Sequence, residues 1–190
     1  MLGHIEPIRE DYVAETWYSD AEKIIRKDYR QPDLFADLLA ATSPWKQVTA
    51  NWRLADRLWR AIGDAERLAD TVANLMPAHA INVIRALQRK PLSGYKVSRF
   101  ARNLKGDGDA VTVDVWICRA YGIADKLSEA TYADIEADIQ QARRKGMRPS
   151  DWQAVIWYAI RRLAGVRGRS FEQAYRAMRS ETMLFSFMHA

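Results

Sequence analysis

The sequence predicts an all-α protein, a compact single-domain helical bundle. Apolar residues recur at spacings of three and four along most of the chain, as expected for helices that bury one face. Proline and glycine divide these segments at short intervals, which favours short connecting turns. Only residues 111–113 read as extended, and they are too few to pair in a sheet. At 190 residues, the chain is long enough for one buried core.

Five helices are expected in the first half of the chain. Pro32, Pro44 and Gly63 mark the ends of three of them, because proline cannot continue a helix and glycine commonly follows one. Pro77 suits the first position of the fifth helix. The expected segments are 12–29, 33–42, 49–62, 64–75 and 77–89.

The second half adds helices around one irregular stretch. A helix over 95–104 is followed by the turn 105–109 and the extended residues 111–113. Asp114, Thr131 and Ser150 are expected N-caps, since their side chains can accept the first backbone N–H groups of a helix. The helices after Thr131 and Ser150 are expected over 131–144 and 151–163, and the last one, over 170–183, precedes an apolar tail that we expect to be docked.

The composition excludes several classes of protein. The single Cys118 allows neither an intramolecular disulfide nor a four-cysteine cluster, and three scattered histidines disfavour a zinc centre. We therefore expect no metal and no cofactor. No apolar run approaches the ~20 residues that span a bilayer, and the N-terminus lacks the apolar core of a signal peptide. We expect no membrane association and a cytoplasmic location.

Basic residues are concentrated near the C-terminus. The formal net charge is +5. The segment 143–179 contains ten Lys or Arg residues, and its only acidic residues are Asp151 and Glu172. Such a surface either follows the phosphates of a nucleic acid or is a solvated helical face. The ten residues are Arg143, Arg144, Lys145, Arg148, Arg161, Arg162, Arg167, Arg169, Arg176 and Arg179.

Two charged residues stand at neighbouring helix starts. Lys96 lies at the start of the helix that follows Gly94, and Asp114 precedes the next helix. A lysine and a carboxylate brought together in this way form either a structural ion pair or an active site. Opening of both side chains into one cleft would favour an enzyme, and burial against each other would favour the ion pair.

Several stretches together resemble a known family. The segment GYKVSRFARNL (94–104), the GDGDA turn (106–110) and VTVDVW (111–116) are similar to the signature of the helix-hairpin-helix (HhH–GPD) superfamily of base-excision DNA glycosylases. Residues 33–43, 132–140 and 152–160 resemble other helices of that superfamily in the same order. The resemblance covers about residues 30–165, with the helices at 12–30 and 170–183 packed on this core. The chain also looks like small phage-encoded proteins of unknown role that share the core.

This resemblance implies a DNA-binding enzyme that acts on a flipped nucleotide, as an N-glycosylase or abasic-site lyase. Lys96 would form the Schiff base of bifunctional members, and Asp114 would be the catalytic aspartate. The partner would be duplex DNA with a flipped base, and we expect a monomer in the cytoplasm of a bacterial or phage-infected cell. The expected DNA contacts are Ser93, Gly94, Tyr95, Arg99, Thr42 and Ser43, and the expected base pocket includes Trp45 and Trp116.

The sequence also departs from the family pattern. The turn Leu92-Ser-Gly-Tyr-Lys96 is shorter than the family hairpin, and Trp116 replaces the usual histidine. Both differences bear on the substrate. Two other functions therefore stay open: a phage DNA base-hypermodification enzyme on the same fold, and a non-catalytic module that binds DNA or protein.

Each candidate residue also has a plainer interpretation. Asp114 can be an N-cap without any catalytic role, and Lys96 can be an exposed lysine or a phosphate contact. Gly94 can be an ordinary turn glycine. Trp116 can belong to the core, and Thr42 can simply end a helix.

Overall fold

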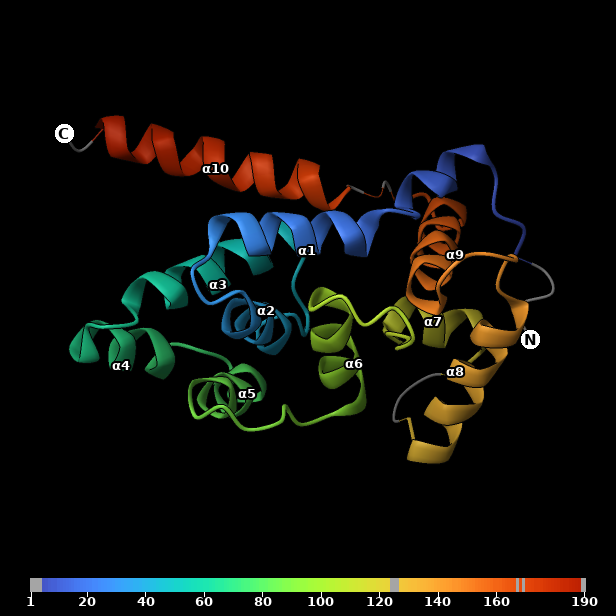
Figure 1. Ribbon diagram of the computed structural model, residues 1–190, viewed down its shortest axis with the longest axis horizontal. Coiled ribbons are helices and arrows are strands. Elements are labelled where there is room, and N and C mark those ends of the chain that lie inside the picture. Colours follow the sequence, from blue (N-terminus) through green and yellow to red (C-terminus); the bar gives the residue numbers. More distant parts are fainter. Residues whose placement is uncertain (1–4, 124–126, 167, 169, 189–190) are drawn as a thin grey trace.

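A buried helix, α2 (Pro32–Ala41), lies at the centre of the structure (Figure 1). The computed structural model describes residues 5–123, 127–166, 168 and 170–188, with side chains up to residue 180. From Leu34 to Ala41 every side chain of α2 except that of Asp37 is buried. Four helices pack against it: α1 (Trp17–Asp28), α3 (Val48–Ala61), α5 (Pro77–Leu87) and α6 (Tyr95–Leu104).

A second group of helices forms around α9 (Pro149–Leu163), which packs against α1 and carries a mostly buried set of side chains. It contacts η1 (Arg9–Ala14), α7 (Val115–Ala120) and α8 (Glu129–Ala142). Outside both groups, α4 (Ala65–Ala73) packs on α3 and α5, and α10 (Phe171–Met188) lies along α1 and α3 (Figure 1). The described residues contain no strand, and the predicted all-α class is confirmed.

Aromatic side chains connect the two ends of the chain to the central helix. Trp52 is fully buried, with its ring centroid 5.2 Å from that of Phe35 in α2. Phe171 of α10 packs edge-on against Trp52 at 5.0 Å and against Trp17 of α1 at 4.6 Å. Edge-to-face pairs at such separations stabilise a core beyond the area that they bury. Helices far apart in sequence are therefore held around one core.

The predicted N-terminal helix is wrong in one respect, because it is broken. Residues 9–14 form a 3₁₀ turn, and the α-helix begins only at Trp17. Asp11 in this turn is buried and accepts two hydrogen bonds from Arg162 of α9, at 3.0 Å from Nε and 3.0 Å from Nη2. The ion pair fixes the turn on α9, and a continuous helix is not formed.

Two predicted caps and the extent of the last helix also differ. Ser128, rather than Thr131, caps α8, because its Oγ accepts the Thr131 N–H at 3.1 Å. Helix α9 begins at Pro149, so that Ser150 lies inside its first turn. Helix α10 continues to Met188, and the side chains of the predicted docked tail lie outside the described residues. The helix predicted over 95–104 has the observed bounds of α6.

No helix in the described part of the chain has both the length and the apolar character needed to cross a membrane.

Candidate active site

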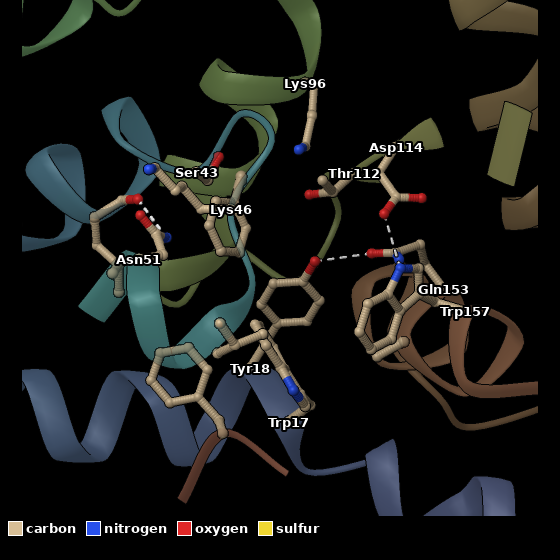
Figure 2. Close-up of a pocket in the computed structure, with 15 residues that line it drawn as sticks. Trp17, Tyr18, Ser43, Lys46, Asn51, Lys96, Thr112, Asp114, Gln153 and Trp157 are labelled. Carbon is tan, nitrogen blue, oxygen red and sulfur yellow. Dashed lines mark hydrogen bonds between the residues drawn. The ribbon is translucent and has the colours of Figure 1, made fainter. Parts of the chain in front are cut away.

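A pocket opens between the two groups of helices, with about 670 Å³ of empty space that is partly open to solvent. Its walls come from α1, α2, α3, α6, α9 and α10 and from the connecting residues Ser43, Lys46, Thr112 and Asp114. Concave pockets lined by apolar groups and a few polar ones are typical binding sites for small molecules. Figure 2 shows that Lys96 and Asp114 both belong to this pocket.

Lys96 lies in the first turn of α6. The loop before α6 is held in place by hydrogen bonds between Ser93 and α5, and it positions this turn at the pocket. Asn82 of α5 accepts the Ser93 N–H at 2.7 Å and donates to the Ser93 carbonyl at 3.1 Å. Gly94 then takes φ +89°, a conformation that side-chain-bearing residues rarely adopt, and starts the helix without a side-chain cap. The Lys96 side chain points into the pocket in Figure 2.

The Lys96 amino group has no hydrogen bond and no ion pair with any described residue. Burial lowers the pKa of Lys96 below its ordinary value, and the charges of Asp114 and Cys118 oppose this change without cancelling it. A lysine with a lowered pKa has a larger neutral fraction near pH 7. Since only the neutral amine is a nucleophile, Lys96 has the property that amine chemistry requires.

Asp114 is held by three hydrogen bonds. Its Oδ1 accepts the N–H groups of Trp116 and Ile117 at 2.9 and 3.1 Å, which confirms the predicted N-cap of α7. Its Oδ2 accepts the indole N–H of Trp157 from α9 at 2.8 Å. The carboxylate is therefore fixed in orientation while it lines the pocket.

The extended residues before Asp114 are held by α8, a contact that the sequence did not reveal. The Tyr132 hydroxyl accepts the Val113 N–H at 2.9 Å and donates to the Val111 carbonyl at 2.8 Å. The carboxylate of Glu136 accepts the Val111 N–H at 3.1 Å. Buried backbone groups outside regular structure need such partners. This clamp determines where Asp114 enters the pocket.

The walls of the pocket are largely aromatic. Trp17, Phe100, Trp157 and Phe171 contribute rings, and Tyr18 donates its hydroxyl to Gln153 Oε1 at 2.8 Å. Aromatic walls with a few polar groups suit a flat, partly polar ligand. Sequence reasoning missed the roles of Trp17, Tyr18, Gln153 and Trp157, because their helical spacing indicates only a buried stripe.

The predicted site residues fall into separate groups. Ser43 lines the pocket together with Lys96 and Asp114. Ser93 and Gly94 are exposed at the start of α6, where they remain accessible to a partner.

The remaining DNA-contact candidates lie elsewhere. Tyr95 is half-buried, with its ring centroid 5.5 Å from that of Tyr132. Arg99 donates to Glu136 at 3.3 Å and lies over the Tyr132 ring, so it supports the clamp on residues 111–113.

Three predicted roles do not fit the structure. Thr42 is fully buried, and its hydroxyl bonds to the Leu38 carbonyl and to Asn51, so it has no free surface for DNA. Trp45 is 82% exposed and does not line the pocket. Trp116 is outside the pocket wall as well, and the guanidinium of Arg119 lies 4.9 Å from its ring centroid.

The basic C-terminal stretch is not one uniform face. Arg148, Arg162 and Arg176 form ion pairs with Asp151, Asp11 and Glu172. Arg161 lies over the rings of Trp116 and Trp157, at 5.3 and 4.5 Å. Residues 143–145 are exposed. Arg167 and Arg169 lie outside the described residues. These pairs reduce the positive surface that the sequence predicts for phosphate contacts.

Within the described residues, no cluster of three or more His, Cys, Asp or Glu side chains is arranged to hold a metal ion.

The lowered pKa of Lys96 predicts a stability effect. Lys96→Met should raise the free energy of unfolding at pH 7 by about 0.5–2 kcal/mol, because the variant no longer buries an ammonium group. In the native protein this cost is full at pH values below the lowered pKa of Lys96, and it disappears as the pH rises toward 10.5, the ordinary pKa of a lysine. The gain in thermal stability should therefore be larger at pH 7 than at pH 10. Lys46→Met, at an exposed lysine of the same pocket, is the control, and an equal gain at both pH values would contradict the prediction.

Comparison with known proteins assigns the chain to a family. It belongs to DUF7178, a family of unknown function, whose model matches residues 10–164. The matched region contains every residue of the pocket except Phe171. Searches of curated proteins and of solved structures found no significant match.

Proposed function

We propose that the protein is a DNA-binding enzyme that acts on a flipped nucleotide, as an N-glycosylase and abasic-site lyase of the HhH–GPD type. One observation carries the proposal: Lys96 and Asp114 open into the same pocket. No ion pair joins them, although both residues are described; Asp114 is held by backbone N–H groups and by Trp157. This arrangement disfavours the alternative in which the two side chains form a structural ion pair.

The two side chains suit the two steps of such a reaction. Cleavage of an N-glycosidic bond builds positive charge on the sugar, and the fixed Asp114 carboxylate would stabilise that charge. The neutral Lys96 amine would then attack C1′ of the sugar. On an open-chain abasic sugar the new C–N bond replaces the carbonyl C–O bond, and water leaves to give an imine.

The surroundings of the pocket support a nucleic-acid substrate. The first N–H groups of α6 have no side-chain cap, and Ser93 and Gly94 beside them are exposed. A helix N-terminus of this kind favours a phosphate group. The aromatic walls would hold a base that has left the helical stack.

Borohydride trapping tests the proposal. A labelled duplex with one abasic site is incubated with the protein and sodium borohydride, which reduces an imine to a stable amine. We expect a covalent adduct with the native protein and none with Lys96→Ala. Lys46→Ala is the matched control, because Lys46 lines the same pocket and should not be needed.

The outcomes separate the candidate functions. Absence of an adduct with the native protein, or an adduct that persists in Lys96→Ala, would overturn the lyase assignment. Salt-dependent DNA binding without any product would instead indicate a binding module. An altered nucleoside in place of a released base, detected by mass analysis, would indicate base modification.

A further inference from the structure

An exposed tryptophan stands on a turn at the rim of the pocket. Residues 43–46 form this turn between α2 and α3, and its first and last residues, Ser43 and Lys46, line the pocket. Trp45 between them does not line it and is 82% exposed, the largest fraction among the large apolar side chains that the structure describes. Single exposed apolar residues are common on protein surfaces, but Trp45 is also unusual in its backbone.

The backbone conformation of Trp45 is unfavourable for its residue type. The Lys46 N–H donates to the Ser43 carbonyl at 3.3 Å, which closes a four-residue turn with Pro44 second and Trp45 third. Trp45 has φ +59°. Proline at the second position and a positive φ at the third are the pattern of a type II turn, whose third position normally holds glycine or asparagine. A bulky residue in that position is strained by about 1–3 kcal/mol.

The strained turn is fixed to the helices on both sides of it. His79 of α5 is 1% exposed, and its Nε2 lies 2.8 Å from the Pro44 carbonyl, which can only accept a hydrogen bond. The Ser43 N–H donates to the Ala40 carbonyl of α2 at 3.1 Å. Trp45 is therefore held at the rim, exposed, in a conformation that costs stability. Backbone strain of this kind is concentrated at ligand-binding and active sites.

The free face of a nucleobase fits an exposed indole beside this pocket. Stacking of one base on an aromatic side chain contributes about 1–3 kcal/mol. In a continuous duplex the base faces are covered, and separating one base step costs a few kcal/mol, which a single tryptophan does not offset. An unpaired strand has free base faces, and its nucleotides need no extrusion from a helix before one of them enters the pocket.

We propose that Trp45 stacks on a base of an unpaired DNA strand while the neighbouring nucleotide occupies the pocket, and that the protein therefore prefers single-stranded DNA to a continuous duplex. The inference rests on the proposed function, since it names the form of DNA that the same site takes. The ion pairs of Arg148, Arg162 and Arg176 agree with it, because they reduce the positive surface that a duplex would contact.

Fluorescence anisotropy of labelled DNA tests the preference. The full chain is titrated into a strand of about 12 nucleotides without self-complementarity, a length within the known range of single-strand sites. The comparison is the same strand annealed to its complement. Phosphate contacts alone favour the duplex, because it carries more charge per unit length. We expect the single strand to bind more tightly, which requires contacts to its bases.

Substitution of Trp45 should change affinity and stability in different directions. Trp45→Gly is expected to weaken single-strand binding roughly 5- to 100-fold, the effect of one lost stacking contact. The same variant should unfold at the native temperature or above it, because glycine adopts a positive φ without strain. A tryptophan that supports the fold would instead lower the unfolding temperature when removed.

Two further variants serve as controls. Trp45→Tyr keeps an aromatic ring at the same place and should retain most of the affinity. Leu163→Ala shortens another exposed apolar side chain, 63% exposed at the end of α9 and outside the pocket wall, and should leave the affinity unchanged.

Three results would overturn the inference: single-strand binding that is absent or no tighter than duplex binding, an unchanged affinity in Trp45→Gly, or a lower unfolding temperature of that variant. Failure of the proposed function has a different signature, which is the absence of a borohydride adduct on abasic DNA. Single-strand binding that depends on Trp45 but gives no adduct would keep the stacking contact and remove the lyase chemistry.

Discussion

Asp114→Asn should reduce the rate of base release by about 10²- to 10⁴-fold, the range expected when one electrostatic or general-base group is removed. Asparagine caps helices about as well as aspartate, so α7 should keep its start and the protein its stability. The variant thus separates the charge of Asp114 from its capping role. The measurement is the single-turnover release of a base from the duplex that a panel of lesion-bearing duplexes identifies as substrate.

Asp109→Asn is the control for this variant. Asp109 is exposed in the turn before the extended segment and does not line the pocket. Its substitution should leave the rate unchanged. Undiminished activity in Asp114→Asn would remove Asp114 from the mechanism and leave it as an N-cap.

Tyr132→Phe should lower the free energy of unfolding by about 2–4 kcal/mol. The buried hydroxyl serves both Val111 and Val113, and its loss leaves one backbone carbonyl and one N–H without partners. An unpaired buried group costs about 1–3 kcal/mol. Urea denaturation monitored by circular dichroism measures the change. Because the clamp positions Asp114, activity should fall as well.

Tyr121→Phe provides the comparison for Tyr132→Phe. The Tyr121 hydroxyl also contacts α8, through Asp138 at 2.6 Å, but it is half-buried and bonds to no backbone group. Its loss should cost about 1 kcal/mol or less. Equal effects of the two substitutions would show that the backbone clamp contributes nothing beyond an ordinary side-chain contact.

Local patterns predicted several parts of the site because their causes are local. The helix over 95–104 depends on its apolar spacing and on the glycine before it. The cap of α7 depends on Asp114 and on the next three residues. The predicted cap at Thr131 was wrong: Ser128, three residues earlier, caps α8.

The pocket could not be predicted in the same way. Trp157 lies 43 positions after Asp114, and Tyr18 lies 135 positions before Gln153, yet both pairs are hydrogen-bonded. Nothing in the spacing of these residues distinguishes a pocket wall from an ordinary buried stripe. Trp45 is the opposite case, because this aromatic residue follows the end of α2 but is 82% exposed and does not line the pocket.

Local sequence patterns alone predict that the chain is helical, where most of its helices begin and end, and that Lys96 and Asp114 stand at two helix starts. Hydrophobic spacing, proline, glycine and caps act within a few residues, so these features are readable along the chain. The packing of the helices brings Lys96 and Asp114 into one pocket without an ion pair between them, and it selects the side chains that enclose them. Those facts depend on how α1, α6, α8 and α9 pack, and packing brings together residues that no local pattern relates.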